Sequence, residues 1–509
     1  MLCSYRDFNK EMFFQQPQAR TYAKLLYGLA FFHASIVERQ RFGALGWNKV
    51  YEFSQADLGI SREQLDVFLG RYSYVPFKVL NEMTGGINYG GRITDDKDLR
   101  TVDVLLRNVF SPKVLEDGYR FSASGKYVSL PYDEDQPLRE YLRAIEELPV
   151  ITEPEAFGMH QNANVMVALD RAYTMFDTIL SIQPRGAGAS GGGSSYLGRV
   201  RAITRTARRL LRQLPANFDA ESIALRYPVQ YSNSMNVVLV QEVIRYNGLL
   251  SVMRSSLQLL LRATAGEVVM SADLEALGDS LFNQWIPAMW QARGYPSLKP
   301  LGAWHRELLR RISFLSHWAA NGPPASFWLS GFFFPQAFLT GTLQNFARKY
   351  QLPVDTLAFS FRVRDDIDAD MSGNEFQLTP PEDGCFIHGL FLEGARWSAD
   401  DHKLATPEPR ELYPAMPVIH LLPVAQWTPA AEGVYRCPVY KTLARQGRLS
   451  TTGHSTNFVM WLELPAHGTS IKRPALVSEV GAGISIGDQL ADTKELVEGG
   501  AAAFCSLRY

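Results

Sequence analysis

The stretch that decides the fold is Leu357-Ala358-Phe359-Ser360-Phe361-Arg362-Val363, in which apolar side chains alternate with small or polar ones. An alternation of period two predicts a strand with one buried face, because successive side chains point to opposite faces of a sheet. Apolar residues before this stretch recur at helical spacing, whereas those after it form short runs bounded by Pro, Gly and charged residues. The sequence therefore predicts an α+β protein that changes from helices to strands near residue 355.

Further strand-like apolar runs follow the first strand. They lie at 385–392, 417–422, 434–440 and 457–464. Several short strands at this spacing predict a closed or nearly closed β-barrel or sandwich. We therefore expect residues 355–509 to form a carboxy-terminal β-barrel.

The first 180 residues predict a mainly helical module. Apolar side chains recur at helical spacing in 22–40, 61–69, 138–147 and 166–182. Ser61 is placed to cap the amino end of the second of these helices. Asn88, Gly90 and Gly91 predict a turn or tight loop, because such residues accept positive φ at little cost.

The sharpest change in composition is the Gly/Ser stretch at 186–195. Such a stretch buries few side chains and loses much backbone entropy on ordering, so we expect a flexible linker or an exposed loop. Helical spacing returns after it and predicts a second helical layer before the strands begin. The helices of this layer are expected at 196–213, 236–264, 302–321 and from Pro335 to Lys349.

The segment from Ala325 to Ala347 has no charged residue and is rich in aromatic side chains. It also contains Pro335, Gln336 and Asn345, which is a heavy polar load for one lipid-spanning helix. We therefore expect a buried core segment and no membrane association.

The composition is that of an ordinary soluble globular protein, with 46% hydrophobic and 20% charged residues among 509. A net charge of −1 argues against whole-surface attraction to nucleic acid or to anionic membranes. The four cysteines are scattered, which favours a reduced intracellular protein over a disulfide framework or a zinc site. Met1 to Phe14 has no apolar core typical of a signal peptide.

Two segments imitate ligand-binding loops without meeting their requirements. A phosphate loop needs Gly-x-x-x-x-Gly-Lys followed by Ser or Thr, and no segment matches. The run from Asp366 to Asp370 resembles the start of an EF-hand, but Met371 replaces the required glycine and Gln377 the required glutamate. We expect a solvated acidic loop there, and no metal-ligating or cofactor-binding residue in the protein.

The loop Gly453-His454-Ser455-Thr456-Asn457 places a histidine beside hydroxyl groups. Adjacent residues of a strand point to opposite faces, so His454 and Ser455 are poorly placed as base and nucleophile. A hydrogen-bonded turn is the simpler interpretation, and no catalytic residue is expected. A hydrolase centred on Gly453–Asn457 remains a rival hypothesis.

Basic side chains dominate the helix predicted after the linker. Arg201, Arg205, Arg208 and Arg212 share one face, and no acidic residue lies between Arg199 and Arg212. The simplest interpretation is a solvated face opposite the apolar stripe. A free-standing adaptor that binds an acidic partner through the Arg199–Arg212 helix is a second rival hypothesis.

Longer strings carry a resemblance to a known family. Those of the first third are 42–48 (FGALGWN), 51–53 (YEF), 57–58 (DL), 88–96 (NYGGRITDD) and 154–163 (PEAFGMHQNA). They resemble the small helical lid of the last AAA+ module of dynein heavy chains.

The strings of the remaining part resemble the carboxy-terminal domain of the same family. They are 234–236 (SMN), 240–242 (VQE), 295–301 (YPSLKPL), 327–334 (FWLSGFFF), 336–340 (QAFLT), 389–397 (GLFLEGARW), 437–442 (CPVYKT) and 449–458 (LSTTGHSTNF). The last group is similar to axonemal members. The colinear strings cover roughly residues 20–465.

The resemblance implies a structural and regulatory part of an axonemal microtubule motor that hydrolyses no ATP itself. In that family, modules upstream bind ATP and magnesium and drive minus-end-directed movement, so no cofactor is expected in this chain. The implied partners are the other AAA+ modules of the heavy chain, intermediate and light chains and, indirectly, microtubules, with no nucleic acid and no membrane. The implied location is the cytoplasmic cytoskeleton and the axoneme of a cilium or flagellum.

The resemblance also implies a division of the chain. Residues 1–21 would end a preceding AAA+ large subdomain, 22–165 form the lid, 166–354 the helical part of the carboxy-terminal domain, and 355–509 its β-barrel part. The tail departs from the family pattern, because 471–494 has no sustained period and resembles an insertion. We expect 497–507 to return to the barrel as a strand.

Overall fold

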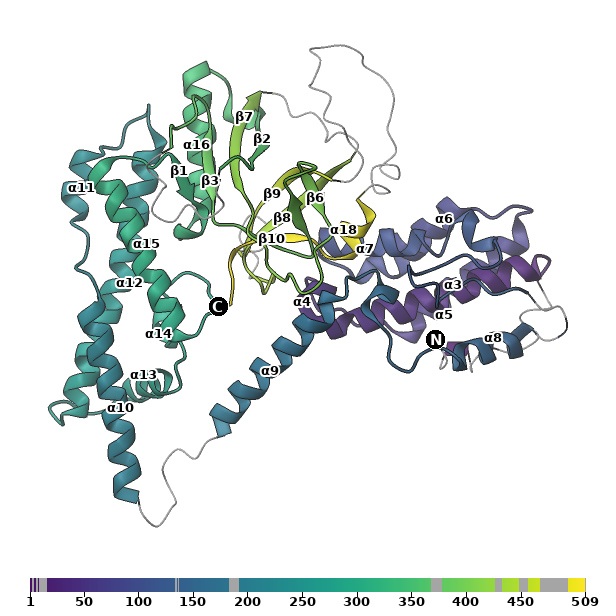
Figure 1. Ribbon diagram of the computed structural model, residues 1–509, viewed down its shortest axis with the longest axis horizontal. Coiled ribbons are helices and arrows are strands. Elements are labelled where there is room, and N and C mark those ends of the chain that lie inside the picture. The colour runs from purple at the N-terminus through teal and green to yellow at the C-terminus, as the bar shows by residue number, and fades with distance from the viewer. Residues whose placement is uncertain are drawn as a thin grey trace.

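The computed structural model describes residues 1, 4–5, 8, 16–132, 135, 137–182, 192–367, 378–425, 433–447, 456–466 and 493–508. Two helical parts lie on either side of a central group of sheets (Figure 1). The helices of residues 19–146 form one end of the molecule, and those of residues 192–321 form the other. The predicted α+β class is confirmed. The predicted change from helices to strands near residue 355 has two exceptions, a strand at Ser326–Trp328 and a helix at Lys494–Glu498.

The amino-terminal part is a helical bundle, as the apolar spacing predicts. Its longer helices are α3 (Ala19–Glu38), α5 (Gln55–Arg71), α7 (Asp96–Arg107) and α8 (Pro137–Glu146). The next helix, α9 (Asn162–Ile182), packs only its first turns against the bundle and projects away from it (Figure 1). The shorter helices of the bundle are η1 (Arg39–Phe42), α4 (Gly43–Gly46), α6 (Phe77–Asn81), η2 (Glu82–Asn88), η3 (Gly90–Arg92), η4 (Pro112–Leu115) and η5 (Pro154–Phe157). The bundle has its own core, to which α3 contributes most of its length.

Two local predictions in this bundle are wrong. Ser61 does not cap a helix, because α5 begins six residues earlier, where Ser54 and Asp57 form a capping box. The segment around Gly90 is not a loop with positive φ but a π-helical turn followed by a 3-10 turn. Gly90 is needed there for close approach, since a Cβ atom would lie 2.3 Å from the main-chain oxygen of Gly85.

The second helical layer is built around one long helix, α12, which packs against α10 and α16. Its helices are α10 (Gly192–Gln213), α11 (Ala220–Arg226), α12 (Ser234–Thr264), α13 (Ala272–Phe282), α14 (Ala288–Gln291), α15 (Leu301–Asn321) and α16 (Pro335–Tyr350). Pro335 occupies the first turn of α16, and Arg348 and Lys349 its last turn, as predicted.

The uncharged segment is a packed core, as predicted. Phe327, Phe332 and Phe338 are buried against one another, with Phe332 and Phe338 stacked at 4.8 Å between ring centroids. Phe333 is half-buried, and Phe334 is 43% exposed. Among the described helices, none is long and apolar enough to cross a membrane.

The described strands form two four-stranded sheets and one two-stranded sheet. The orders are β1-β3-β7-β2, β4-β10-β8-β9 and β5-β6. The strands are β1 (Ser326–Trp328), β2 (Leu357–Arg364), β3 (Cys385–His388), β4 (Phe391–Glu393), β5 (Arg396–Ser398), β6 (Lys403–Ala405), β7 (Val418–Ala425), β8 (Val434–Thr442), β9 (Phe458–Pro465) and β10 (Ala502–Ser506). The described strands do not close into the expected barrel, because each of these sheets has two edge strands.

The strand-forming end of the chain returns to a sheet, as predicted. After the short helix α18 (Lys494–Glu498), β10 enters between β4 and β8, antiparallel to the first and parallel to the second. It is therefore a central strand, and every residue from Ala502 to Ser506 is buried. The predicted insertion, 471–494, lies outside the described residues except for 493–494, and Lys494 already begins α18.

Candidate functional site

The segments with possible catalytic or metal-binding residues do not assemble into one site among the described residues. Asp366 pairs with Arg364 at 2.7 Å, whereas Asp368 and Asp370 lie outside the described residues, as do His454 and Ser455. Within the described ranges, no group of three His, Cys, Asp or Glu side chains could hold a metal ion.

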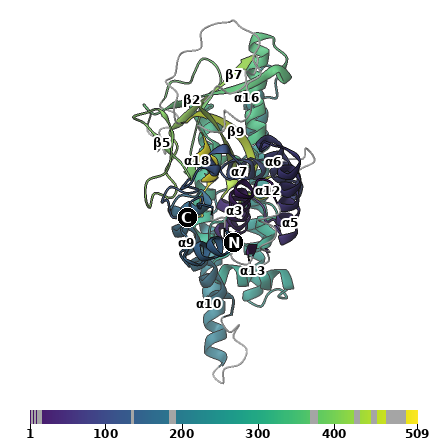
Figure 2. The same ribbon diagram turned by 90° about the vertical axis from the view of Figure 1, so that its right-hand side faces the viewer.

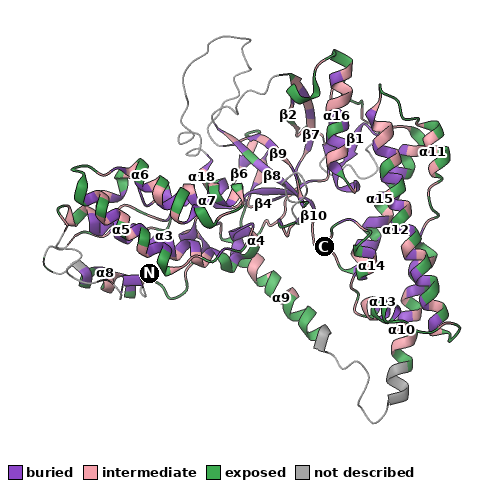
Figure 3. Ribbon diagram, turned by 180° about the vertical axis from the view of Figure 1, so that it is seen from behind, coloured by how far each residue is buried: buried purple, intermediate pink, exposed green. Residues whose placement is uncertain are grey.

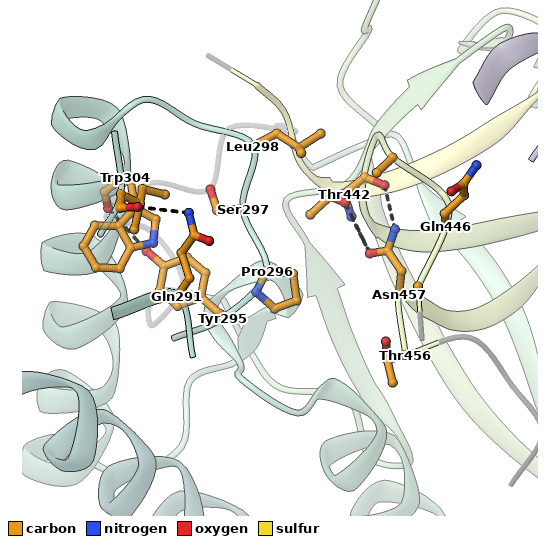
Figure 4. Close-up of a pocket in the computed structure, with 13 residues that line it drawn as sticks. Gln291, Tyr295, Pro296, Ser297, Leu298, Trp304, Thr442, Gln446, Thr456 and Asn457 are labelled. Carbon is orange, nitrogen blue, oxygen red and sulfur yellow. Dashed lines mark hydrogen bonds between the residues drawn. The ribbon is translucent and has the colours of Figure 1, made fainter. Parts of the chain in front are cut away.

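A cavity of about 310 Å³ lies between the helical layer and the end of β8 (Figure 4). Thr456 and Asn457, at the edge of the proposed hydrolase loop, line it. Asn457 is held by Thr442, whose main-chain nitrogen donates to its side-chain oxygen at 3.1 Å. The described lining residues include no carboxylate, histidine, lysine, arginine or cysteine. Their one phenol, Tyr295, donates its hydroxyl hydrogen to the main-chain oxygen of Trp304 at 3.3 Å, so this lining pairs no base with a nucleophile.

The site with the most specific geometry is the junction between the amino-terminal bundle and the sheets. Arg39, at the end of α3, is 1% exposed. Its guanidinium donates to the main-chain oxygens of Gly46 (3.3 Å), Phe157 and Glu498 (2.9 Å). Three segments far apart in the sequence therefore meet on one side chain. Burial lowers the pKa of Arg39 to about 10, so it stays charged at neutral pH.

A second buried arginine, Arg445, also joins separate segments of the chain, and it does so from the side of the sheets. Arg445 follows β8 with a left-handed φ of 54°. It pairs with Glu393 of β4 and donates to the main-chain oxygen of Gly500 (2.8 Å) and to Asn48 of the bundle (3.4 Å). Burial disfavours its charge, but the nearby Glu393 carboxylate more than offsets this and raises the pKa of Arg445.

The helix α18 joins the two arginines. The carboxylate of Glu498 accepts a hydrogen bond of 2.6 Å from Asn108, just after α7. Gly158, which has φ of +72°, approaches the same residue so closely that a Cβ atom would lie 2.8 Å from the Cβ of Glu498. Burial raises the pKa of the Glu498 carboxyl. The bundle thus fits around α18 without room for a larger side chain at Gly158.

The outer rim of the junction is aromatic and cationic. Lys97 of α7 lies 4.8 Å from the ring centroid of Phe458 and 5.0 Å from that of Trp461. Arg100, one turn later, donates to the hydroxyl of Tyr435 at 3.2 Å and lies over its ring. Cations over aromatic faces add about 0.5–2 kcal/mol each, so the rim supports the buried contacts.

This junction can hold two parts of the molecule in one orientation, but its described residues offer no nucleophile with an adjacent base. Sequence reasoning missed Arg39 and Arg445, because an isolated arginine has no motif. A partial signal exists: Gly46, Gly158 and Glu498 all lie in strings singled out for other reasons.

Two family models match most of the sequence. Residues 22–163 match the AAA lid domain of dynein heavy chains, and residues 169–480 match the C-terminal domain of dynein heavy chains. Dynein axonemal heavy chain 1 of Rattus norvegicus is 46% identical over 467 residues, which cover 92% of this chain and 10% of the relative. Dynein axonemal heavy chain 3 of Mus musculus is 44% identical over 463 residues, which cover 89% of this chain and 11% of the relative. Dynein axonemal heavy chain 12 of Rattus norvegicus is 44% identical over 453 residues, which cover 87% of this chain and 14% of the relative.

These matches define the class as an AAA+ lid joined to a carboxy-terminal domain. The chain belongs to the dynein heavy chain family, and it corresponds to the carboxy-terminal region of its axonemal members. It spans only about a tenth of the length of these relatives.

Proposed function

We propose that this protein is the mechanical carboxy-terminal part of an axonemal dynein heavy chain. The observation that carries the proposal is the junction on Arg39 and Arg445, which locks the lid to the sheets through α18. Buried charges that are paired or hydrogen-bonded resist separation, because either partner alone would be left desolvated and unpaired. A rigid lid-to-sheet connection suits a part that passes on movement rather than generating it.

The remaining assignments rest on the family. ATP and magnesium would be bound by other modules of the heavy chain, which would drive minus-end-directed movement along microtubules. The partners would be those modules, with intermediate and light chains, in the axoneme of a cilium or flagellum. The division at 21, 165 and 354 and the closure of the strands of 355–509 into a barrel remain parts of the same proposal.

An ATPase assay tests the absence of hydrolysis. The purified protein is expected to give no magnesium-dependent phosphate release above a buffer control. Activity that co-purifies with it through two orthogonal columns, and falls with the Ser455→Ala change, would support the hydrolase instead.

Hydrogen exchange tests the mechanical part separately. Arg445→Met is expected to speed amide exchange both at 45–49 in the bundle and at 496–502, because the change releases contacts on both sides of the junction. Arg362→Met is a matched control, since Arg362 is exposed on β2, a strand of the other four-stranded sheet. Faster exchange confined to the immediate neighbours of residue 445 would contradict a coupling role.

A further inference from the structure

One face of α10 carries arginine side chains that nothing in the described part of the molecule neutralises. Arg201, Arg205, Arg208, Arg209 and Arg212 are exposed and form no ion pair with any described residue. We call these five residues the α10 basic face. Arg199 does not belong to it, because it pairs with Asp279 and lies over the ring of Phe282.

The concentration of positive charge on this face is unusual for the molecule. The whole sequence has a net charge of −1, yet α10 carries six arginines and no acidic residue. Other exposed arginines either pair with a carboxylate, as Arg20 does with Asp117, or stand singly on the surface, as Arg71 does. Five unpaired guanidinium groups repel one another along one helix, at a cost to helix stability. An external anion would remove that cost and gain charge-assisted hydrogen bonds.

The opposite face of α10 argues against a membrane as the anion. Ile203, Ala207, Leu210 and Leu214 are buried in the helical layer. An interfacial helix needs its apolar face free to enter the lipid, and this one is already packed. Attraction to lipid headgroups would then rest on the arginines alone.

The neighbouring helix argues against a long polyanion such as nucleic acid. α13 packs against α10 and carries the exposed acids Asp273 and Glu275. The positive field is therefore limited to one helix face. From Arg201 to Arg212 this face extends about 17 Å at 1.5 Å per residue, which matches an extended segment of about five residues.

We propose that the α10 basic face is a docking surface for a short acidic polypeptide segment of a partner protein. Arginine forks bind carboxylates bidentately, so a run of Glu or Asp side chains fits the row of guanidinium groups. The helix α10 lies at the opposite end of the molecule from α3 and α5 of the lid (Figure 1), and it projects downward in Figure 2, while the five arginines of its basic face are exposed to a partner. The proposal goes beyond the mechanical role and does not depend on it.

The test is a binding titration with a fluorescein-labelled peptide of ten glutamates, read by fluorescence anisotropy on the 509-residue chain. The test variant is R201E/R205E/R208E/R212E. The matched control is R71E/K78E/K113E/K126E, which makes the same charge change at exposed lid positions. Both variants must keep the melting temperature and far-ultraviolet circular dichroism of the wild type, which is expected because all eight side chains are exposed.

The expected result is a loss of affinity of about tenfold or more in the α10 variant and little change in the lid variant, since charges at the contact dominate over net charge. Wild-type binding should weaken as salt rises. Equal losses in both variants would overturn the proposal, because binding would then follow net charge alone. Tighter binding to vesicles of phosphatidylserine and phosphatidylcholine, or to a 20-nucleotide RNA, would also overturn it. If the α10 variant does not fold, R205E/R208E is titrated in its place, with R71E/K78E as control.

Discussion

Arg39 donates a hydrogen bond of 2.9 Å to the main-chain oxygen of Glu498, a residue 459 positions later in the sequence. This contact joins the end of α3 to α18 just before the last strand enters its sheet. The burial of both residues makes the contact one that water cannot replace. Much of the exposed surface is elsewhere, on helices such as α9 (Figure 3).

The first prediction concerns Arg39 itself. Arg39→Met should lower the free energy of unfolding by about 2–4 kcal/mol, because three buried carbonyl oxygens lose their donor. Arg41→Met is the control, since Arg41 is exposed and pairs only with Glu38 on the surface, and it should cost less than about 1 kcal/mol. Urea unfolding followed by circular dichroism measures both. Similar losses in the two variants would mean that the buried contacts contribute little.

The second prediction separates backbone strain from close packing at Gly158. Gly158→Ala should destabilise the protein by about 1 kcal/mol for the left-handed φ, and by more for the contact with Glu498. Gly118→Ala is the control, because Gly118 has φ of +76° but nothing lies within 4 Å of its Cβ position. Thermal unfolding compares the two. If Gly118→Ala is as damaging as Gly158→Ala, α18 is not packed as tightly as described.

The third prediction compares two changes near the end of the chain. Replacing 471–492 with a short Gly/Ser linker should leave the melting temperature nearly unchanged, as the sequence pattern of an insertion predicts. Ending the chain after Leu496 should lower it strongly, because loss of β10 exposes the edges of both β4 and β8. The reverse ranking of the two melting temperatures would refute the assignment.

The fourth prediction tests the aromatic core. Phe338→Ala should cost about 3–5 kcal/mol, because the ring is fully buried against Phe327 and Phe332. Phe334→Ala should cost much less, because Phe334 is 43% exposed. Chemical unfolding of the pair measures the difference, and equal costs would show that burial does not decide the loss.

The fifth prediction concerns acid stability. Burial lowers the pKa of His33 to about 4, below its ordinary value of 6.5. The unfolded protein therefore binds a proton at His33 before the folded protein does, and stability falls as the pH drops from about 6.5 towards 4. Asp98 has the opposite effect on stability, because burial raises its pKa to about 6 and the folded protein therefore binds a proton there before the unfolded protein does.

The comparison of wild type with His33→Gln isolates the histidine. Between pH 7 and pH 5 the wild type should lose about 1–2 kcal/mol more than the variant. Urea unfolding at both pH values measures this difference. A variant with the same pH dependence as the wild type would show that His33 does not bind the extra proton on unfolding.

Much of the fold could be predicted because it depends on local periodicity. The helical spacing before residue 355 and the alternation in 357–363 reflect burial of one face, which the order of side chains records directly. The sequence places the start of α5 wrongly, at Ser61, because serine is a common capping residue. In the structure Ser61 lies inside the helix, where its hydroxyl donates to the main-chain oxygen of Asp57. Local chemistry alone does not distinguish these two uses of a serine.

The sequence by itself determined the class of fold, the position of the core segment and the family. Only the tertiary structure decided that the last strand is central, that the described strands form separate sheets, and that Arg39 and Arg445 hold the bundle to them. Strand order and hydrogen bonds to main-chain oxygens depend on which segments meet in space. Every residue has a main-chain oxygen, so the residue type does not reveal which oxygen a buried arginine will bind, and the sequence cannot predict the pairing.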